Sequence, residues 1–90
     1  MVRVIKSGKY TQMLREMLKE YDLETLKLVN KRVDLFISNS SDTRLKNHLL
    51  SGKMSGQFAF SINDDIRIIY EVIGKNTVRF LAIGPHEKVY

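Results

Sequence analysis

Ninety residues without a cysteine make one small domain, residues 1–90, and exclude both a disulfide framework and a thiolate metal site. No apolar run reaches the roughly 20 residues that cross a bilayer, and the first ten residues do not resemble a signal peptide, so we expect a cytoplasmic protein without a membrane partner. Lysine and arginine (15) outnumber aspartate and glutamate (10), and the net charge of +5 favours a polyanion, above all a nucleic acid, or an acidic protein as partner.

The first part of the chain predicts a short strand followed by two helices. Val2–Lys6 alternates apolar and polar side chains, which is typical of a strand. From Lys9 to Tyr21 the apolar residues recur at i, i+3, i+4 and i+7, which predicts an amphipathic helix. A second apolar stripe runs over 26–37, and Asp22 before it is a candidate N-cap. Because few residues join the two helices, we expect an antiparallel hairpin.

The middle of the chain is rich in turn formers. Ser38–Ser41 predicts a loop, and Asp42 or Thr43 is a candidate cap for a short helical turn over residues 45–50. Ser51–Gly56 predicts a second loop with two glycines and one lysine. This loop lacks the Gly-Lys-Ser/Thr order and the strand-to-helix context of a nucleotide-binding loop, so the sequence does not predict a P-loop.

Three β-branched runs in the last part of the chain predict an antiparallel meander. The runs are Gln57–Ile62, Ile66–Ile73 and Thr77–Gly84, and polar turn formers separate them. Each run alternates with a period of two residues, which is the period of a strand. In the last run this alternation places on one face Val78, Phe80 and Ala82, and on the other face Arg79, Leu81 and Ile83.

Together these elements predict an α+β fold, a small domain in the order β-α-α-β-β-β. A meander needs one covered face, so the helical hairpin should pack on one face of the antiparallel sheet. The residues expected on that face are Phe58, Phe60, Ile68, Tyr70 and Phe80. The opposite face carries Arg67, Glu71 and Arg79 among aliphatic side chains. A mixed face of this kind suits a ligand or a partner segment.

The two histidines of the chain lie at the margins of the meander and are candidate proton-transfer groups. His86 follows the last run, after Gly84-Pro85, on a rim rather than in the core, and histidine transfers protons near neutral pH. The alternative for both His86 and His48 is a solvated loop histidine. Asp65 lies at a hairpin turn, where aspartate is also common for purely structural reasons.

Arg67 lies between isoleucines in the middle run, where a guanidinium is costly unless it is paired or directed at an anion. Glu71, on the same predicted face, is the candidate partner for a simple ion pair. Neither histidine has a partner four residues away on a helix, and no carboxylates cluster in the sequence. We therefore expect no metal ligands.

Three segments of the sequence form a recognisable combination. They are the loop His48–Lys53 with Gly56 after it, the strand Asp65–Tyr70, and the terminal stretch Ile83–Tyr90. This combination resembles the RelE/ParE toxin superfamily and, within it, most closely the YafQ-type mRNA interferases. The predicted β-α-α-β-β-β order matches that fold, so the resemblance covers the whole chain.

The resemblance implies a bacterial toxin that cuts mRNA in the ribosomal A site, without a metal or other cofactor, and that a cognate acidic antitoxin holds silent. The positions that match functional residues of the family are His48, Asp65, Arg67, His86 and Tyr90. The sequence also departs from the family pattern. Ser61 stands where YafQ-like toxins carry a further histidine, and Phe58 and Phe60 stand near the lysines of RelE-like toxins.

Cleavage by the substrate's own 2′-hydroxyl needs a base, an acid and positive charge on the phosphate. By the resemblance, His86 is either the acid or the base, and the other of these two roles belongs to His48 or Asp65. Arg67 would hold the phosphate, and Tyr90 would stack on a base or orient the phosphate. Salt-sensitive contacts to the RNA backbone and the ribosome are expected from Lys46, Lys53 and Lys88.

Two other functions are compatible with the same resemblance. One is a ParE-like toxin that inhibits DNA gyrase by binding and has no nuclease activity. The other is an inactive member that only binds its antitoxin. A ParE-like protein does not need an acid–base set, so the five family-matching residues together favour the nuclease.

Overall fold

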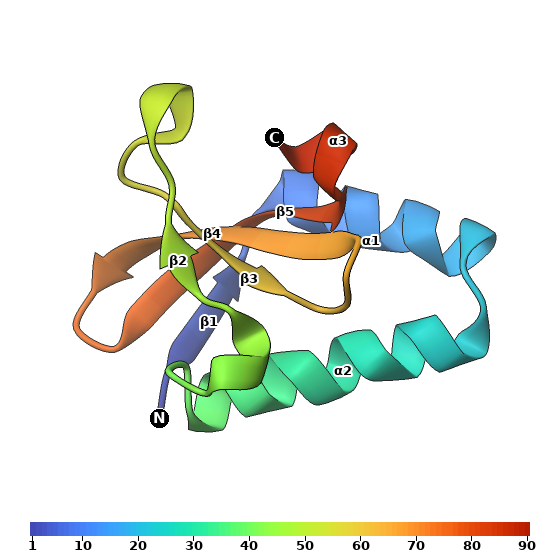
Figure 1. The fold of residues 1–90 in the computed structure, drawn as a ribbon, viewed down its shortest axis with the longest axis horizontal. Coiled ribbons are helices and arrows are strands. Elements are labelled where there is room, and N and C mark those ends of the chain that lie inside the picture. Colours follow the sequence, from blue (N-terminus) through green and yellow to red (C-terminus); the bar gives the residue numbers. More distant parts are fainter.

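The computed structural model describes the whole chain, Met1 to Tyr90, as a β-sheet between a helical hairpin and a short terminal helix (Figure 1). The elements in chain order are β1 (Arg3–Lys6), α1 (Gly8–Glu20), α2 (Leu23–Ser38), the 3₁₀ turn η1 (Thr43–Leu45), β2 (His48–Leu49), the 3₁₀ turn η2 (Gly52–Met54), β3 (Phe58–Ser61), β4 (Ile66–Gly74), β5 (Thr77–Pro85) and α3 (His86–Val89). The predicted α+β class and the helical hairpin on one sheet face are confirmed. None of the helices is both long and apolar enough to cross a lipid bilayer.

The sheet has five strands in the order β1-β5-β4-β3-β2. Strands β3, β4 and β5 form the predicted antiparallel meander. Strand β1 lies parallel to β5, with Val4 beside Val78, so the sheet is mixed rather than purely antiparallel. The α1–α2 hairpin carries the chain away from β1 before the meander begins. The partner of β1 is therefore a strand more than 70 residues later in the sequence.

The prediction of a helical turn over residues 45–50 is wrong for most of its length. Asp42 does cap a turn, because its side chain accepts a hydrogen bond from the Arg44 N–H, but this 3₁₀ turn ends at Leu45. Lys46 then adopts the left-handed conformation, with φ of +50°, and turns the chain into β2. The short β2 pairs with the first two residues of β3 and forms one edge of the sheet.

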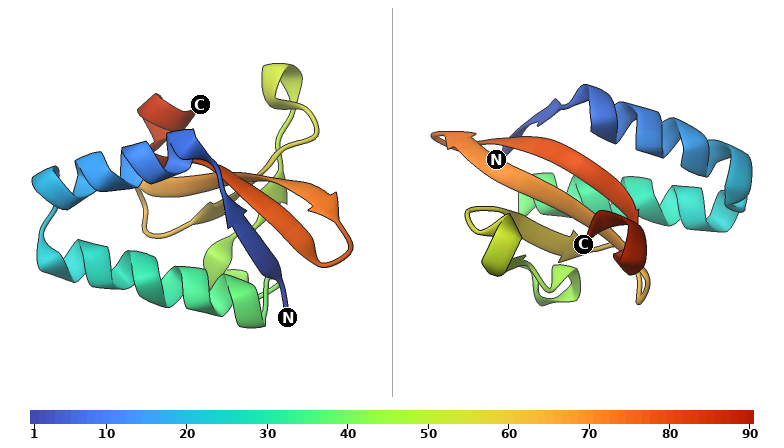
Figure 2. Two further views of the ribbon diagram at one scale, coloured as in Figure 1. Left: turned by 180° about the vertical axis from the view of Figure 1, so that it is seen from behind. Right: turned by 90° about the horizontal axis from the view of Figure 1, so that it is seen from above.

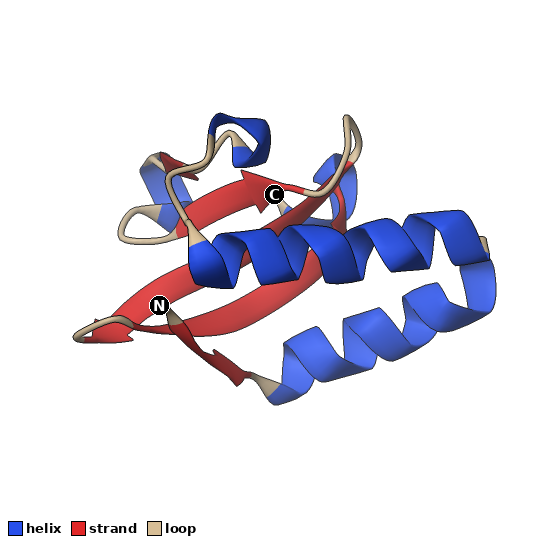
Figure 3. Ribbon diagram, turned by 90° about the horizontal axis from the view of Figure 1, so that it is seen from below, coloured by secondary structure: helices blue, strands red, loops and turns tan.

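The two long helices begin at side-chain caps. Asp22 accepts a hydrogen bond from the Thr25 N–H at 3.0 Å, which confirms the predicted cap of α2. The Ser7 hydroxyl accepts one from the Tyr10 N–H and caps α1 in the same way. Each cap satisfies a backbone donor that the first helical turn leaves free. Figure 3 shows α1 and α2 lying side by side over one face of the sheet.

The main core is an aromatic cluster between α2 and the sheet. The Phe36 ring of α2 stacks on Phe60 with ring centroids 4.4 Å apart, and it lies edge to face with Tyr70 with centroids 4.9 Å apart. On the α1 side, Tyr10 packs against Phe80 at 5.2 Å. These five residues are buried, and the predicted helix-facing side chains of the sheet lie in or against this core.

A β-bulge in β5 breaks the predicted alternation of that strand. Ile69 of β4 pairs with Ala82, whereas the next residue of β4 pairs with Phe80, so Leu81 has no partner. Ala82 therefore packs on the face away from the helices, and Ile83 turns into the main core, which is the reverse of the prediction. The alternation of apolar and polar residues in the sequence does not show where a bulge inserts one extra residue into a strand.

The terminal helix α3 lies on the opposite side of the sheet from α1 and α2 (Figure 2, right). Its Val89 packs on a small second core made by Ala59, Ile69 and Ala82. The chain turns into α3 after Gly84, which has φ of +156° and whose missing Cβ would lie 3.6 Å from Val89. Glycine adopts this φ without strain, so it allows α3 to fold back over the sheet.

Candidate functional site

Arg67 lies on the sheet face that α3 covers only in part. It is on β4, between Ser61 of β3 and Gly84 of β5. Its neighbours on the strand, Ile66 and Ile68, point into the main core, so the Arg67 side chain points to the other face. Ser61, which stands where YafQ-like toxins carry a histidine, is buried beside it.

His48 lies on this same face. Its register partner is Ala59, which belongs to the second core under α3, and partners in an antiparallel pair point to the same side. His48 and Arg67 are two strands apart, about 10 Å across the sheet, and one same-face step apart along it, about 7 Å. Both side chains therefore project from the same face, with about 12 Å between their positions on the sheet.

The Arg67 guanidinium has no carboxylate partner. Its Nη1 donates to the carbonyl oxygen of Asn63 at 2.8 Å and, more weakly, to that of Ile66 at 3.4 Å. The sequence suggested an ion pair between Arg67 and Glu71, and this prediction is wrong. Glu71 Oε2 instead accepts a hydrogen bond from Arg79 Nη1 at 3.2 Å. The charge of Arg67 is therefore available to an anion at the surface of the sheet.

Asn63 is a positioning residue that the sequence analysis did not single out. Its Oδ1 accepts hydrogen bonds from the N–H groups of Asp65 at 2.9 Å and of Ile66 at 2.7 Å. Its carbonyl oxygen holds Arg67. This Asx turn therefore fixes both the backbone at the start of β4 and the position of the Arg67 guanidinium. The signal was present in the sequence, since Asn63 opens the turn-forming stretch before β4.

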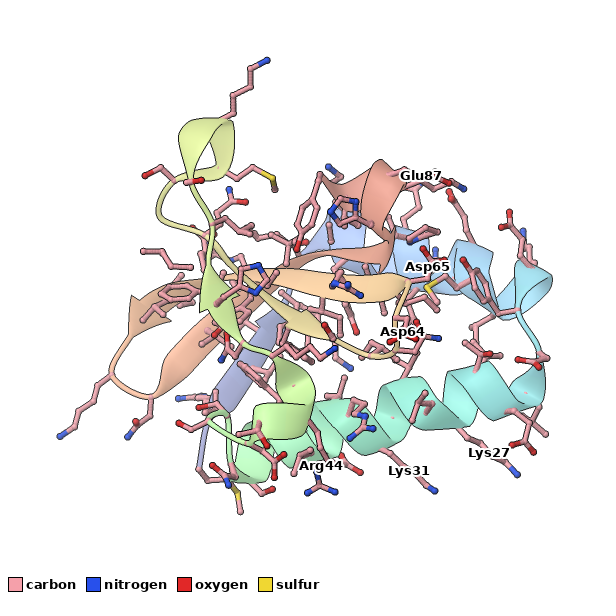
Figure 4. The ribbon with its side chains drawn as sticks, viewed as in Figure 1. Lys27, Lys31, Arg44, Asp64, Asp65 and Glu87 are labelled. Atoms are coloured by element: carbon pink, nitrogen blue, oxygen red, sulfur yellow. The ribbon has the colours of Figure 1, made fainter.

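His86, Tyr90 and Asp65 meet at one end of this face. The His86 N–H donates to the Asp65 carbonyl oxygen at 3.0 Å. The His86 and Tyr90 rings meet edge to face, with centroids 4.2 Å apart and an angle of 90°. All three residues are exposed. Figure 4 shows Asp65 at the same corner of the molecule as Asp64 and Glu87, so carboxylates flank this end of the site.

His48 is held at the other end by a short contact to its own chain. Its Nδ1 lies 2.9 Å from the carbonyl oxygen of Lys46. Because a carbonyl only accepts, the neutral ring carries its proton on Nδ1 and leaves Nε2 as a free acceptor. An imidazole in this tautomer is suited to accept a proton at Nε2 from a substrate.

The predicted lysines lie around the site rather than inside it. Lys46, Lys53 and Lys88 are all exposed. Lys88 is on α3, beside the terminal corner, and Lys46 precedes β2. Lys53 is on η2, in the loop that stands away from the sheet in Figure 1. Each of them adds a positive charge to the surface around the site.

A groove of about 550 Å³ runs past β2 next to His48 and Lys46. Two of its wall residues are Tyr70, whose pKa burial raises, and Asp42, whose pKa is lowered to about 2 by hydrogen bonds from Arg44. The Tyr70 hydroxyl donates to Asn47 Oδ1 at 2.8 Å. Near neutral pH, Tyr70 is therefore protonated and Asp42 is ionised. No group of three or more histidine, cysteine, aspartate or glutamate side chains is arranged to hold a metal ion.

No protein-family model matches the sequence, and no curated protein sequence does. Solved toxin structures match along nearly the whole chain. A metal-bound toxin from Helicobacter pylori is 22% identical over 100% of both chains, with a TM-score of 0.78. The Escherichia coli DinJ-YafQ toxin-antitoxin complex matches at 25% identity over 99% of this chain and 97% of that chain, with a TM-score of 0.74. A YoeB/ParE toxin from Agrobacterium tumefaciens is 15% identical over 94% of this chain and 99% of its own, with a TM-score of 0.76. The chain thus has the fold of the RelE/ParE toxin superfamily, as the resemblance in its sequence implied.

Proposed function

We propose that this protein is the toxin of a type II toxin–antitoxin system and that it cuts mRNA on the ribosome. The observation that carries the proposal is the position of Arg67, a guanidinium without a carboxylate partner on the sheet face that also holds His48. His86 and Tyr90 border this face at its other end. A fixed positive charge between two imidazoles suits a phosphodiester whose cleavage needs an acid and a base.

The cleavage needs one proton taken up and one proton delivered. The base removes the proton of the substrate 2′-hydroxyl, and the oxygen attacks the adjacent phosphorus. The bond from phosphorus to the 5′-oxygen breaks, leaving a 2′,3′-cyclic phosphate, and the acid protonates the departing 5′-oxygen. Arg67 stabilises the charge that develops on the phosphate, a contribution of roughly 3–4 kcal/mol for one well-placed donor.

We assign the base to His48 and the acid to His86. The hydrogen bond of His48 Nδ1 to the Lys46 carbonyl oxygen leaves Nε2 able to accept a proton. His86 is exposed at the opposite end of the face, which supports its assignment as the group that protonates the leaving oxygen. Asp65 is the second candidate for the base. Each acid–base group contributes about 10²–10⁴-fold in rate, so the remaining acceleration comes from the ribosome positioning the mRNA.

The proposed partners are a cognate acidic antitoxin, the ribosome and its mRNA, which places the protein in the cytoplasm. Structures of a DinJ-YafQ toxin–antitoxin complex support a protein antitoxin for a chain of this fold. The net charge of +5 suits both an acidic antitoxin and ribosomal RNA. The exposed Lys46, Lys53 and Lys88 are the proposed backbone contacts, with Tyr90 as a base-stacking or phosphate-orienting group.

The test is expression of the chain without its antitoxin, followed by mapping of RNA 5′ ends. We expect growth arrest and new ends within translated coding regions, and none in an RNA that is not translated. Lys75→Ala, at the exposed β4–β5 turn far from the site, should cut like the unaltered chain. Intact transcripts together with trapped gyrase–DNA complexes would move the protein to the ParE-like class.

A further inference from the structure

A second hollow lies on the same face of the sheet as Arg67. Its volume is about 360 Å³. The sheet residues Ile69, Leu81 and Ala82 form its apolar floor, Met54 and Val89 form its walls, and the exposed Lys9 lies on the rim. Ile69, Ala82 and Val89 belong to the second core, so the accessible apolar surface comes from the partly exposed Leu81 and Met54. Ile69 follows Arg67 by two residues on β4, so the hollow begins about 7 Å along the strand from the guanidinium.

The β-bulge in β5 builds the floor of this hollow. Leu81 and Ala82 are consecutive residues, and in a regular strand they would point to opposite faces. Because Leu81 is unpaired in the bulge, both side chains line the same hollow. The Leu81 carbonyl oxygen accepts a hydrogen bond from the Ser7 hydroxyl at 3.3 Å, which ties the bulge to the start of α1. Bulges next to active sites commonly redirect side chains in this way.

The chemistry of the hollow suits one nucleotide. Its floor and walls are apolar, as the flat face of a base requires, and Gln57 lies among the lining residues with an amide that can meet a base edge. No carboxylate lines it, and the exposed Lys9 supplies a positive charge at the rim. Single-stranded nucleic acids bind to this combination of a base platform and a backbone cation.

From this geometry we infer that the hollow binds the base of a nucleotide next to the scissile phosphate, and that Lys9 holds that nucleotide's own phosphate. The inference rests on the proposed nuclease function and adds to it a determinant of sequence preference. The hollow continues the face that carries Arg67, so a strand whose phosphate lies at Arg67 passes over it in one nucleotide step. Tyr90 follows α3 directly after Val89 and does not line the hollow, so it is a separate place for a second base.

Binding is measured first without the ribosome, by methyl NMR of the whole chain with a 2′-O-methyl RNA trinucleotide, which cannot be cut. We expect the methyl signals of Ile69, Leu81 and Val89 to shift, while those of the exposed Leu23 and Val72, outside the hollow, stay in place. Unshifted signals from the hollow would overturn the inference. It would also be overturned if these signals shifted only with an acidic peptide and not with the oligonucleotide.

Two variants then separate the rim from the floor. Lys9→Ala should weaken oligonucleotide binding several-fold and lower the slope of log affinity against log salt by about 0.7, as expected for one lost phosphate contact. The matched control is Lys19→Ala, which removes an exposed lysine at the far end of α1. It should leave the oligonucleotide affinity and the salt slope unchanged. Met54→Ala widens the hollow and should change which bases flank the cut sites on ribosomes. Equal oligonucleotide affinities and equal salt slopes for Lys9→Ala and Lys19→Ala would overturn the proposed contact of Lys9 with a phosphate.

These outcomes distinguish a failure of the inference from a failure of the proposed function. A chain that cuts mRNA but keeps its base preference in Met54→Ala and shows no shifts in the hollow would refute only the nucleotide site. A chain that binds the trinucleotide in the hollow but never cuts translated RNA would refute the nuclease and the role of the hollow in cleavage preference, and would leave the hollow as a nucleotide-binding site.

Discussion

The backbone N–H of His86 donates a hydrogen bond to the carbonyl oxygen of Asp65 at 3.0 Å, which joins the first residue of α3 to the turn before β4. This bond uses main-chain atoms on both sides, so it holds the terminal corner whatever side chains stand there. The side chains of His86 and Asp65 remain exposed and free to meet a substrate. Substitutions here therefore test chemistry with little effect on the fold.

His86→Ala should reduce cleavage on ribosomes by about 10²-fold or more, because a general acid–base group contributes at least that much. The melting temperature and antitoxin binding should stay unchanged, since the exposed ring is lost while the N–H to Asp65 remains. The measurement is single-turnover cleavage of a defined mRNA on purified ribosomes. A near-normal rate would show that His86 transfers no proton, and Asp65 and His48 would then be the pair to test.

Arg67→Ala should lower the cleavage rate by roughly 10²–10³-fold, because it removes the charge that stabilises the phosphate. Since Arg67 is in neither of the two ion pairs of the chain, its loss should change the melting temperature little. Arg79→Ala is the matched control on the same face. It breaks a half-buried surface ion pair with Glu71, worth about 0–1 kcal/mol, and should leave cleavage intact. Equal rates for the two variants would remove Arg67 from the mechanism.

Removal of transition metals should leave cleavage unchanged, because the proposed acid, base and phosphate-binding groups are all side chains. No group of three possible ligands is present to hold such an ion. The measurement is ribosome-dependent cleavage after treatment with a chelator, with the magnesium that ribosomes need restored. An H. pylori toxin of the same fold was solved with metal bound, so the chelator experiment decides whether cleavage by this chain needs a metal. Recovery of activity with one specific transition metal would contradict the prediction.

Tyr10→Phe should make the protein more resistant to alkaline unfolding. Burial raises the pKa of Tyr10 to about 12 from its ordinary value of 10.0, so the neutral form is favoured in the folded state. The stability that depends on this shift is fully present below pH 10 and is lost as pH rises toward 12, a loss of about 3 kcal/mol. Phenylalanine keeps the ring against Phe80 and cannot ionise.

The measurement for this prediction is denaturant unfolding at several values between pH 9 and pH 12. The difference in unfolding free energy between Tyr10→Phe and the unaltered chain should grow with pH over that window. Tyr21→Phe, at the partly exposed end of the same helix, is the matched control. A difference that stays constant with pH would show that Tyr10 ionises as easily in the folded state as in the unfolded one.

Local patterns in the sequence were enough for the long helices and the meander of this fold, but not for β2, η2 and α3. The helix of α1, the cap at Asp22 and the three strands of the meander were all predicted, because each depends on a period or a side-chain bond within a few residues. The helix-facing core followed from the same alternation. The roles of His48, Asp65, Arg67, His86 and Tyr90 came from the family resemblance and stay predictions.

The tertiary structure decided the features that depend on distant partners. The parallel pairing of β1 with β5, the bulge at Leu81 and the pairing of Glu71 with Arg79 are set by neighbouring strands. The sequence period contains no information on which strand lies alongside or where one residue is inserted. The hollow beside Lys9 exists for that reason, because the bulge turns Leu81 and Ala82 to one face and the parallel β1 brings the start of α1 next to them.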